Sequence, residues 1–444
     1  MIRKAVELIE KGKFTQARSE ILDMNAVDIA EVFEELDSEK LLVMFRLLPK
    51  EMAVDVFSYI SSELQEYLIE AIADKEIQTI VDELFLDDTV DLLEEMPANI
   101  VKKILKNTSK DKRDLINHFL KYPENSAGSI MTIEYVDLKK EMTVREALAN
   151  IKKVGVDKET INTSYVIDEN RKLEGIVSLR KLIINDEVTV IKDIMQTNII
   201  SINTHMDQEE IASIIKKYDL LVVPVVDNEE RLVGIITIDD VVDIIDQENT
   251  EDFQKMAAMH PSDEEYLKTG IFTSAKHRVG WLLVLMISAT ITGNIIKQYN
   301  DILQSVVILV AFIPMLMNTG GNSGSQSATL VIRGLALDEI RLKDVWKVLW
   351  KEFRVSIVVG FVLAGVNFIR IYYLERTDLY VAITVCVSLF ITVITAKLVG
   401  GVLPIIAKKM KLDPAIMASP LVTTIVDAVA LVTYFSIATL LMRL

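Results

Sequence analysis

Residues 413–442 read DPAIMASPLVTTIVDAVALVTYFSIATLLM, and Asp427 is the only formal charge between Asp413 and Arg443. The apolar part, from Pro414 to Met442, is longer than the ~30 Å hydrocarbon core of a bilayer when it is helical at ~1.5 Å per residue. The stretch therefore predicts a membrane-spanning helix with a carboxylate near its middle. A charge at that depth is costly unless it faces water, an ion or a partner group.

Polar residues share one side of this predicted helix with the acid. Ser419, Thr423 and Thr424 precede Asp427 at spacings that place them on its face. A polar stripe that leads to a mid-membrane carboxylate is typical of the wall of a cation path. The alternative is an acid that hydrogen-bonds to a neighbouring helix and serves packing alone.

Charge is distributed unevenly along the 444 residues, whose net charge is −17. Residues 276–444 contain 16 Lys or Arg and 9 Asp or Glu, whereas residues 1–275 contain 32 and 56, a net charge of −24. An acidic body joined to an apolar, mildly basic half indicates cytoplasmic domains attached to a membrane domain. So negative a body repels nucleic acid and attracts small cations.

The single cysteine, Cys386, lies in an apolar run and has no intrachain partner, which excludes an intrachain disulfide. The N-terminus has no apolar core of signal-peptide length. Insertion into a membrane is therefore expected to depend on the later segments.

Residues 1–125 are predicted to form an acidic domain of short amphipathic helices. Helix starts recur every ten to twelve residues, near Asp28, Ser38, Lys50, Ser62, Asp74, Leu86, Ala98 and Ser109. One such helix cannot bury its apolar stripe alone, so stacked hairpins in a small superhelix are expected. The acids Asp87 to Glu95 form either a solvated face or a divalent-cation contact shared with another domain.

An internal duplication occupies residues 126–245. YVIDENRKLEGIVSLRKL at 165–182 recurs as PVVDNEERLVGIITIDDV at 224–241, and Asp168, Gly175 and Ser178 each have a counterpart 59 residues later. Each copy predicts two strands joined by a hairpin and followed by a helix. The repeats resemble tandem CBS modules, α+β units that bind adenosine ligands. That resemblance places a nucleotide at Thr237 and Asp240, although the first repeat has Lys181 in place of Asp240.

An acidic connector at 246–275 follows the repeats. The helix that leads into it contains Asp239, Asp240, Asp243, Asp246, Glu248, Glu251 and Asp252, and it is expected to run until Pro261. Like charges three and four residues apart destabilise a helix. Bound divalent cations would relieve this repulsion, which makes the helix either an ion sensor or a solvated connector.

Five apolar segments in residues 276–444 predict a five-span transmembrane domain: 279–296, 302–317, 355–368, 381–407 and 415–442. Basic residues gather before the first span and in the second and fourth loops. The positive-inside rule therefore places the N-terminal body in the cytoplasm and the C-terminus outside. This is the arrangement of a multi-pass protein of the cytoplasmic membrane.

The second segment runs into PMLMNTGGNSGSQSATLVIRGLA. Pro314, Gly320, Gly321 and Gly324 predict a broken helix at membrane depth, where freed carbonyls would line a cavity. The side-chain oxygens of Asn322, Ser325 and Gln326 suit Mg²⁺ or its water shell. A small-residue packing face is the alternative, and a phosphate-binding loop is disfavoured because its lysine is absent.

Three charged residues lie in or at the membrane segments. Glu352 and Arg354, at the entrance of the third segment, are expected to pair with each other or with the glycine-rich segment, and Glu352 could also admit cations. Lys397, within the fourth segment, is expected to snorkel or to be paired.

The order of these parts, with GGNSGSQSATLVIRGLA and DPAIMASPLVTTIVD, resembles the MgtE family of magnesium transporters across essentially the whole chain. The resemblance implies a homodimer in the lipid bilayer whose pore runs between two membrane domains. A carboxylate matching Asp427 would hold a largely hydrated Mg²⁺ there, and Mg²⁺ bound to the cytosolic domains would close the pore. ATP or another adenosine nucleotide would bind the CBS pair.

The pore residues expected from these motifs are Asp427, Thr423, Gly321, Asn322, Ser325, Gln326 and Glu352. The regulatory metal ligands expected from the resemblance are Asp87, Asp91, Glu209, Asp219, Asp240, Asp243, Glu248, Glu251 and Asp413. Ser325 and Ser419 stand at pore-adjacent positions where other members carry larger amides.

Two other function classes are disfavoured. A nucleotide-regulated membrane enzyme needs a nucleophile and a base, and all four histidines lie outside the membrane segments. A transporter of anions or organic solutes fits poorly with a lone mid-membrane acid and with the lack of basic pore residues. The sequence therefore predicts a magnesium-selective, channel-like transporter that is not an enzyme.

Overall fold

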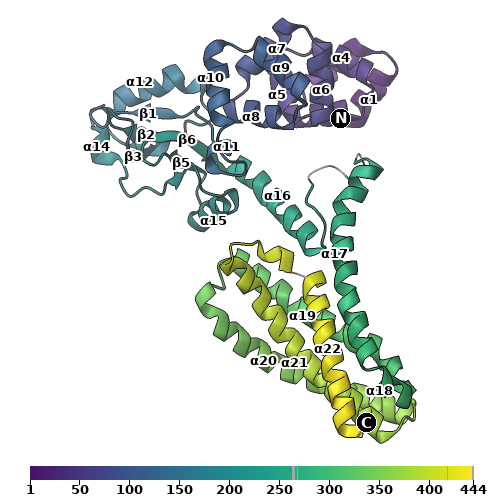
Figure 1. Ribbon diagram of the computed structural model, residues 1–444. Helices are drawn as coiled ribbons and strands as arrows, with labels where there is room; N and C mark the ends of the chain where they lie inside the picture. The colour runs from purple at the N-terminus through teal and green to yellow at the C-terminus, as the bar shows by residue number, and fades with distance from the viewer. Residues whose placement is uncertain (263–265, 268, 418, 443–444) are drawn as a thin grey trace. The chain divides into compact units, whose positions relative to one another are not determined.

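The computed structural model describes residues 1–262, 266–267, 269–417 and 419–442, except for the side chain of Ser419. The predicted flank Arg443 and part of the predicted linker 246–275 lie outside the described residues. The chain divides into two compact units, Met1–Ile244 and Ile245–Leu444, and each is described by itself (Figure 1).

Ten short helices begin the first unit. They are α1 (Ile2–Glu10), α2 (Phe14–Ile21), α3 (Ala26–Glu34), α4 (Ser38–Leu47), α5 (Lys50–Tyr59), α6 (Ser62–Ala71), α7 (Asp74–Glu83), α8 (Leu86–Glu95), α9 (Ala98–Asn107) and α10 (Lys110–Phe119). The predicted starts are confirmed to within two residues. Most of these helices follow a polar or proline cap; Asp37, for example, accepts a hydrogen bond from the Lys40 amide at 3.0 Å.

Alternate helices of this series pack on each other. α3 contacts α5, α5 contacts α7, and α7 contacts α9. The apolar faces of the helices bury large side chains, such as Phe33, Phe57 and Leu68, where neighbouring helices pack. The predicted stacked helical domain is therefore present, and its core is a sum of neighbour contacts.

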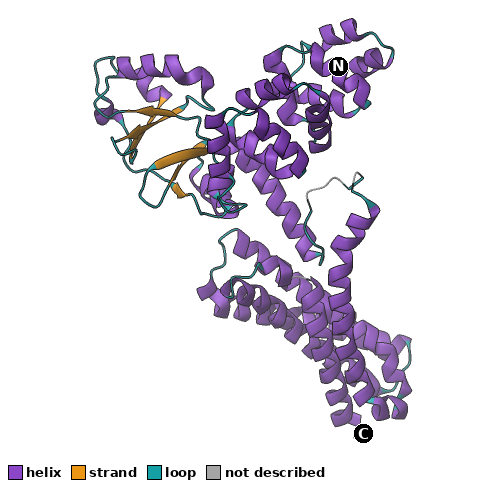
Figure 2. Cartoon of the chain, turned by 45° about the horizontal axis from the view of Figure 1, so that its top comes forward, coloured by secondary structure: helices purple, strands orange, loops and turns teal. Residues whose placement is uncertain are grey.

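Two three-stranded sheets follow, coloured orange in Figure 2. The elements are α11 (Ala127–Ile130), β1 (Val136–Leu138), α12 (Val144–Val154), η1 (Gly155–Asp157), β2 (Thr163–Ile167), β3 (Leu173–Ser178), α13 (Leu179–Ile184), α14 (Ile191–Ile194), β4 (Ile202–Asn203), α15 (Gln208–Tyr218), β5 (Val222–Val226) and β6 (Leu232–Thr237). In each sheet a parallel pair is followed by an antiparallel pair.

The duplication extends to strand register. Thr163 pairs with Ser178 in the first sheet, and Val222 pairs with Thr237 in the second. Each partner in the second pair lies 59 residues after its counterpart in the first. A register shift also occurs at equivalent places, Val166/Ile167 and Val225/Val226. The predicted tandem α+β repeats are confirmed.

The acidic helix α16 (Ile238–Met256) ends earlier than its sequence predicts. The sequence pattern extended the helix to Pro261, but Ala258 adopts φ 54° and the Met259 amide donates to the Gln254 carbonyl at 2.9 Å. This backbone reversal closes the helix with its own hydrogen bonds. The proline is therefore not the residue that ends it.

Within the described residues, the second unit has five helical segments that are long and apolar enough to span a membrane. They are Ile271–Gln298, Val307–Ala336, Leu342–Leu374, Leu379–Lys409 and Pro414–Met442. Their elements are α17 (Ile271–Gln298), α18 (Asn300–Ser305), η2 (Val307–Phe312), α19 (Ile313–Ala336), η3 (Leu342–Asp344), α20 (Val345–Ile369), η4 (Arg370–Leu374), α21 (Leu379–Lys409), η5 (Pro414–Met417) and α22 (Ser419–Met442). The predicted number of spans is confirmed.

The predicted helix break in the glycine-rich segment is wrong. α19 is continuous from Ile313 to Ala336, and Pro314 lies in its first turn, where a missing amide proton is tolerated. The irregular backbone lies upstream, in the 3₁₀ turns of η2. Backbone carbonyls of the glycine-rich segment are therefore engaged within a helix and are not free ligands.

The glycines of α19 permit close helix packing. A Cβ on Gly320 would come within 2.9 Å of Val426 on α22, and a Cβ on Gly400 of α21 would overlap the Gly324 carbonyl. The small-residue alternative is thus the observed one. It brings α19 against both α21 and α22.

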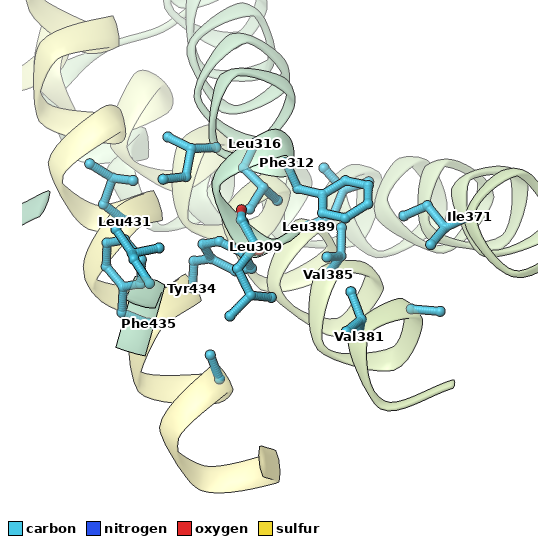
Figure 3. Packing of buried hydrophobic residues seen from close by; sticks show 14 of the residues in the cluster. Leu309, Phe312, Leu316, Ile371, Val381, Val385, Leu389, Leu431, Tyr434 and Phe435 are labelled. Carbon is cyan, nitrogen blue, oxygen red and sulfur yellow. Dashed lines mark hydrogen bonds between the residues drawn. The ribbon is translucent and has the colours of Figure 1, made fainter. Parts of the chain in front are cut away.

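A second core lies farther along these helices (Figure 3). Side chains from η2, α19, α21 and α22 meet there, and the Tyr434 hydroxyl donates to the Leu309 carbonyl at 3.0 Å. This bond satisfies a carbonyl that the irregular turn leaves unpaired. This core fixes the position of α22 and therefore the position of Asp427 along the span.

Candidate functional site

Asp427 lies on α22 directly after Val426, which packs against Gly320 of α19. Its Oδ1 atom is buried and accepts no hydrogen bond from the residues that the structure describes. The alternative in which a neighbouring helix holds the acid by hydrogen bonds therefore finds no support in this part of the chain. An orphaned carboxylate oxygen inside a membrane span is suited to a cation or its water shell.

The α19–α22 contact brings two predicted pore residues together. A Cβ on Gly321 would lie 2.8 Å from Thr423 Cγ2, so Thr423 occupies the space that the glycine leaves. Thr423 is one helical turn from Asp427 on α22. The structure therefore places Gly321, Thr423 and Asp427 along one helix junction.

The outer face of α19 carries a row of amides. Asn318, Asn322 and Gln326 are exposed at i, i+4 and i+8, and Asn322 Nδ2 donates to Asn318 Oδ1 at 3.1 Å. Ser325 lies beside this row and is half-buried. Exposed amides at membrane depth suit a water-filled path or another protein surface and are costly against lipid.

Glu352 and Lys397 do not lie on that row. Both are buried, and both bond to Ser327 on α19. Arg354 instead lies over the Trp350 ring, 5.9 Å from its centroid. Of the two predicted partners of Glu352, the glycine-rich segment is confirmed, through Ser327, and Arg354 is not. Lys397 bonds to the same serine, so it is paired and does not snorkel.

In the first unit, α8 and the start of α16 form an acidic cluster. Asp240 lies near enough to Asp87 and Asp88 to add to the burial that raises their pKa values, and Asp240 accepts a hydrogen bond from Thr237 Oγ1 at 2.7 Å. The members of this cluster are Asp87, Asp88, Asp91, Glu134, Glu159, Asp239 and Asp240.

Burial makes ionisation of this cluster costly. Burial first, and neighbouring acids second, raise the pKa of Asp88 to about 6 and the pKa values of Asp91 and Glu159 to about 7. The same causes raise the pKa of Asp87 well above its usual range. The cluster contains a cation, Lys112, whose ammonium donates to the Leu84 carbonyl at 2.7 Å.

Two other predicted ligands do not join this cluster, and a third, Asp243, only borders it, where it adds to the burial that raises the pKa of Asp240. Glu209 lies in the first turn of α15, and Asp219 caps its far end with φ 51°. They are therefore separated by about 15 Å of helix rise. Asp243 is exposed on α16.

In the second unit, the end of α16 contacts the loop before α22, and the two form a second cluster. Its members are Glu251, Asp252, Lys255 and Asp413. The Lys255 ammonium pairs with Glu251 and, at 2.6 Å, with Asp413 Oδ2. Burial opposes ionisation of Lys255, but the two ion pairs outweigh it and raise its pKa. Burial and then Asp413 raise the pKa of Asp252 to about 6. The predicted Glu251–Asp413 proximity is thus present, with a lysine between the carboxylates.

Neither cluster is a finished coordination shell. Within the described ranges, no three His, Cys, Asp or Glu side chains are arranged to hold one metal ion. Mg²⁺ usually keeps several waters and needs few protein oxygens. The buried, mutually repelling carboxylates therefore fit a hydrated Mg²⁺ better than a dehydrated one.

The cavity in the repeats lies away from the predicted nucleotide residues. It has a volume of about 540 Å³ and is lined by Asn162, Ser178, Leu179, Arg180, Ile183, Ile184 and Leu221. Thr237 and Asp240 belong to the acidic cluster, which repels phosphate. Ser178, the equivalent of Thr237 in the first repeat, borders the cavity together with a basic residue, Arg180.

Comparisons with known proteins cover almost the whole chain. The Thermus thermophilus protein named magnesium transporter MgtE is 36% identical over 98% of this chain and 97% of its own length. A Bacillus subtilis protein of the same name is 33% identical over 99% and 97%. The chain belongs to the MgtE family.

Family models and solved structures agree with this MgtE assignment. The models match as MgtE intracellular N domain at 24–125, CBS domain at 127–185 and 191–247, and divalent cation transporter at 313–437. A structure titled as the cytosolic domain of the Mg²⁺ channel MgtE in complex with ATP is 35% identical, with a TM-score of 0.52 over 55% of this chain and all of that one. A structure titled as the soluble part of a magnesium transporter is 31% identical, also with a TM-score of 0.52, over 56% and 97%.

Several residues of this MgtE chain were missed by sequence reasoning. Glu159 and Glu134 enter the acidic cluster from the first repeat, and Lys255 enters the second cluster. Asn318 extends the row of amides, and its i, i+4 spacing from Asn322 was the available signal. The glutamates and the lysine gave no such signal, because their partners are distant in sequence.

The raised carboxyl pKa values predict a pH-dependent stability of the unit Met1–Ile244. Between the usual carboxyl pKa near 4 and the raised values of about 6 and 7, the folded unit binds more protons than the unfolded chain. The stability from these groups is therefore fully present below pH 4 and is lost as the pH rises through 6 and 7. Without Mg²⁺ we expect the melting temperature of this unit to fall by roughly 5 °C over that range, since 1 kcal/mol corresponds to about 2–4 °C.

Millimolar Mg²⁺ should restore most of this loss at pH 8 and little at pH 5, as measured by calorimetry. The control is Asp88→Asn with Asp91→Asn, which should flatten both the pH and the Mg²⁺ dependence. A melting temperature that rises with pH in the absence of Mg²⁺ would contradict the burial argument.

Proposed function

We propose that this chain is a magnesium-selective, channel-like transporter that works as a homodimer and is closed by Mg²⁺ bound to its cytosolic acids. The observation that carries the proposal is the buried, unbonded Oδ1 of Asp427 inside a membrane span. The names of the relatives, magnesium transporter, support the choice of ion.

The pore would lie along the junction of α19 and α22. Asp427 would supply the charge. The path around it would be narrow and polar, and it would be lined by Thr423, Gly321, Asn322, Ser325 and Gln326. One carboxylate per chain cannot replace six ligands, so the ion would pass largely hydrated.

A second copy would cover the exposed amides and contribute a second Asp427. Light scattering of the solubilised protein should then give twice the mass of the chain.

Orientation follows from the number of spans. Five crossings place the two ends on opposite sides of the membrane, and the basic loops favour a cytoplasmic N-terminus and an external C-terminus. A compartment-sensitive reporter fused to each end tests this arrangement. The same reporter signal at both ends would contradict it.

The pore assignment predicts that Asp427→Asn abolishes or sharply reduces Mg²⁺ uptake while preserving the fold. A unit charge at ~4 Å contributes about 4 kcal/mol at an effective dielectric constant of 20. Loss of that attraction exceeds the ~1.4 kcal/mol that corresponds to a tenfold change. We therefore expect at least a tenfold decrease in liposome flux.

Asp301→Asn is the matched control, because Asp301 is an exposed acid at the start of α18. This variant should transport like the wild type. Undiminished uptake by folded Asp427→Asn protein would return Asp427 to a packing role.

Gating would act through the two acidic clusters. Mg²⁺ relieves the repulsion among buried carboxylates, and it shifts the equilibrium only by binding the closed form more tightly. At the second cluster it would have to displace the Lys255 ammonium from Glu251 and Asp413. Glu209 and Asp219, which the structure does not bring together, remain proposed ligands toward a second copy.

The gating proposal predicts the behaviour of a triple variant, Asp243→Asn, Glu248→Gln and Glu251→Gln. Conduction should remain, and the cytosolic Mg²⁺ concentration for half-closure should rise several-fold in excised patches. A control triple replaces the exposed acids Glu31, Glu35 and Glu39 by glutamine. If both triples close at the wild-type concentration, the acidic helix is a connector only.

We further propose that an adenosine nucleotide binds at the cavity beside Ser178 and Arg180. The relative solved with ATP supports a nucleotide at the cytosolic domains. The cavity bears a guanidinium for phosphate, whereas Thr237 and Asp240 adjoin buried acids.

Arg180→Ala should therefore weaken binding of a fluorescent ATP analogue at least tenfold, and Thr237→Ala should change it little. Equilibrium titration of the full-length protein measures both. A selective loss in Thr237→Ala would place the nucleotide at the second repeat instead.

A further inference from the structure

A charged network is buried where three helices of the membrane unit meet. It consists of Lys397 on α21, Glu352 on α20 and Ser327 on α19, whose exposed fractions are 4%, 7% and 0%. None of these side chains is part of the amide row on α19, and none of them is the acid at the α19–α22 junction. The proposed function gives the network no role.

The hydrogen bonds of the network form a chain of donors that leads from Lys397 through Ser327 to Glu352. Lys397 Nζ donates to Ser327 Oγ at 3.4 Å and to the Ser323 carbonyl at 3.5 Å, while Ser327 Oγ donates to Glu352 Oε2 at 2.6 Å. An ammonium can only donate, so it leaves the serine proton for the carboxylate. The 2.6 Å distance is typical of a hydroxyl bonded to an ionised carboxylate.

The helix surfaces around the network are shaped to admit it. Gly401 lies one turn after Lys397 on α21, and a Cβ there would come within 3.2 Å of Glu352 Cγ. Gly400 allows α21 to touch α19 at Gly324. In the described part of the chain, no carboxylate forms a direct ion pair with Lys397, so Ser327 is the link between the two charges.

The lysine lies close to the junction that holds Asp427. A Cβ on Gly320 would touch both Thr392 on α21 and Val426, the residue before Asp427. Lys397 follows Thr392 by five residues, about 7.5 Å of helix rise. In a low-dielectric interior, an uncompensated ammonium beside the ion path would repel a divalent cation strongly.

We propose that Glu352 permits the passage of cations by cancelling the charge of Lys397 through Ser327, so that Asp427 alone sets the charge of the ion path. This inference rests on the proposed function, because it requires cations to pass beside Asp427. Glu352 is then a compensating residue and not an ion ligand.

The sign of the remaining charge separates this role from packing. Glu352→Gln keeps the shape and the bond to Ser327 but leaves a lone ammonium, which repels Mg²⁺. Lys397→Met leaves a lone carboxylate, which does not. A network that serves packing alone predicts comparable losses from both variants, because each removes one buried partner.

The test is Mg²⁺ uptake into liposomes by wild type, Glu352→Gln, Lys397→Met and the double variant, each checked for folding by thermal melting. We expect at least a tenfold loss in Glu352→Gln, flux no lower than wild type in Lys397→Met, and recovery to within threefold of wild type in the double variant. Glu375→Gln is the matched control, since Glu375 pairs with Arg370 outside the network.

Equal losses in the two single variants, or no recovery in the double variant, would overturn the inference while wild-type transport upholds the proposed function. Absence of wild-type Mg²⁺ flux would overturn both. If Glu352→Gln does not fold, the other two variants decide: a loss of flux in folded Lys397→Met protein overturns the inference, and undiminished flux with an active double variant supports it.

Discussion

The constraint on which this structure depends is the burial of one carboxylate inside a membrane span. Asp427 has an oxygen without a hydrogen-bond donor among the described residues, yet the helix that carries it is anchored by a dense core around Tyr434 and Phe435. The packing fixes the position of this half-buried acid along the span. Its buried oxygen therefore favours the approach of a cation, and the glycines of α19 bring a polar helix to the same junction.

The unit Met1–Ile244 buries carboxylates as well. Its acids are desolvated against one another, so that carboxyl pKa values rise and ionisation weakens the packed arrangement. Lys112 is a tethered cation in this acidic cluster, and Lys255 has the same position between Glu251 and Asp413 in the second unit. If Mg²⁺ binds at these carboxylates as proposed, it competes with lysine ammonium groups.

Local signals in the sequence predicted most of the fold. Caps fixed the starts of α4 and α10, and the 59-residue offset predicted two copies of one α+β unit, whose strand registers match at the same offset in the structure. The glycine-rich segment was misjudged, because glycine lowers helix propensity locally while its missing side chain stabilises helix packing at Gly324 and Gly400. Depth in the membrane made Asp427 a candidate, and the glycine-rich segment was correctly predicted as one possible partner of Glu352. The partners of Lys255 could not be predicted, since they depend on which segments meet.

The central claim is that Asp427 binds a hydrated Mg²⁺, and the most direct measurement is an experimental structure of the protein with Mg²⁺, or with Mn²⁺ located by its anomalous signal. The account predicts an ion between two copies of Asp427 with water in its first shell, so that the carboxylate oxygens lie beyond the direct Mg²⁺–oxygen distance of about 2.1 Å. Direct coordination by a complete shell of protein oxygens, or an ion path that leaves Asp427 unoccupied, would contradict it.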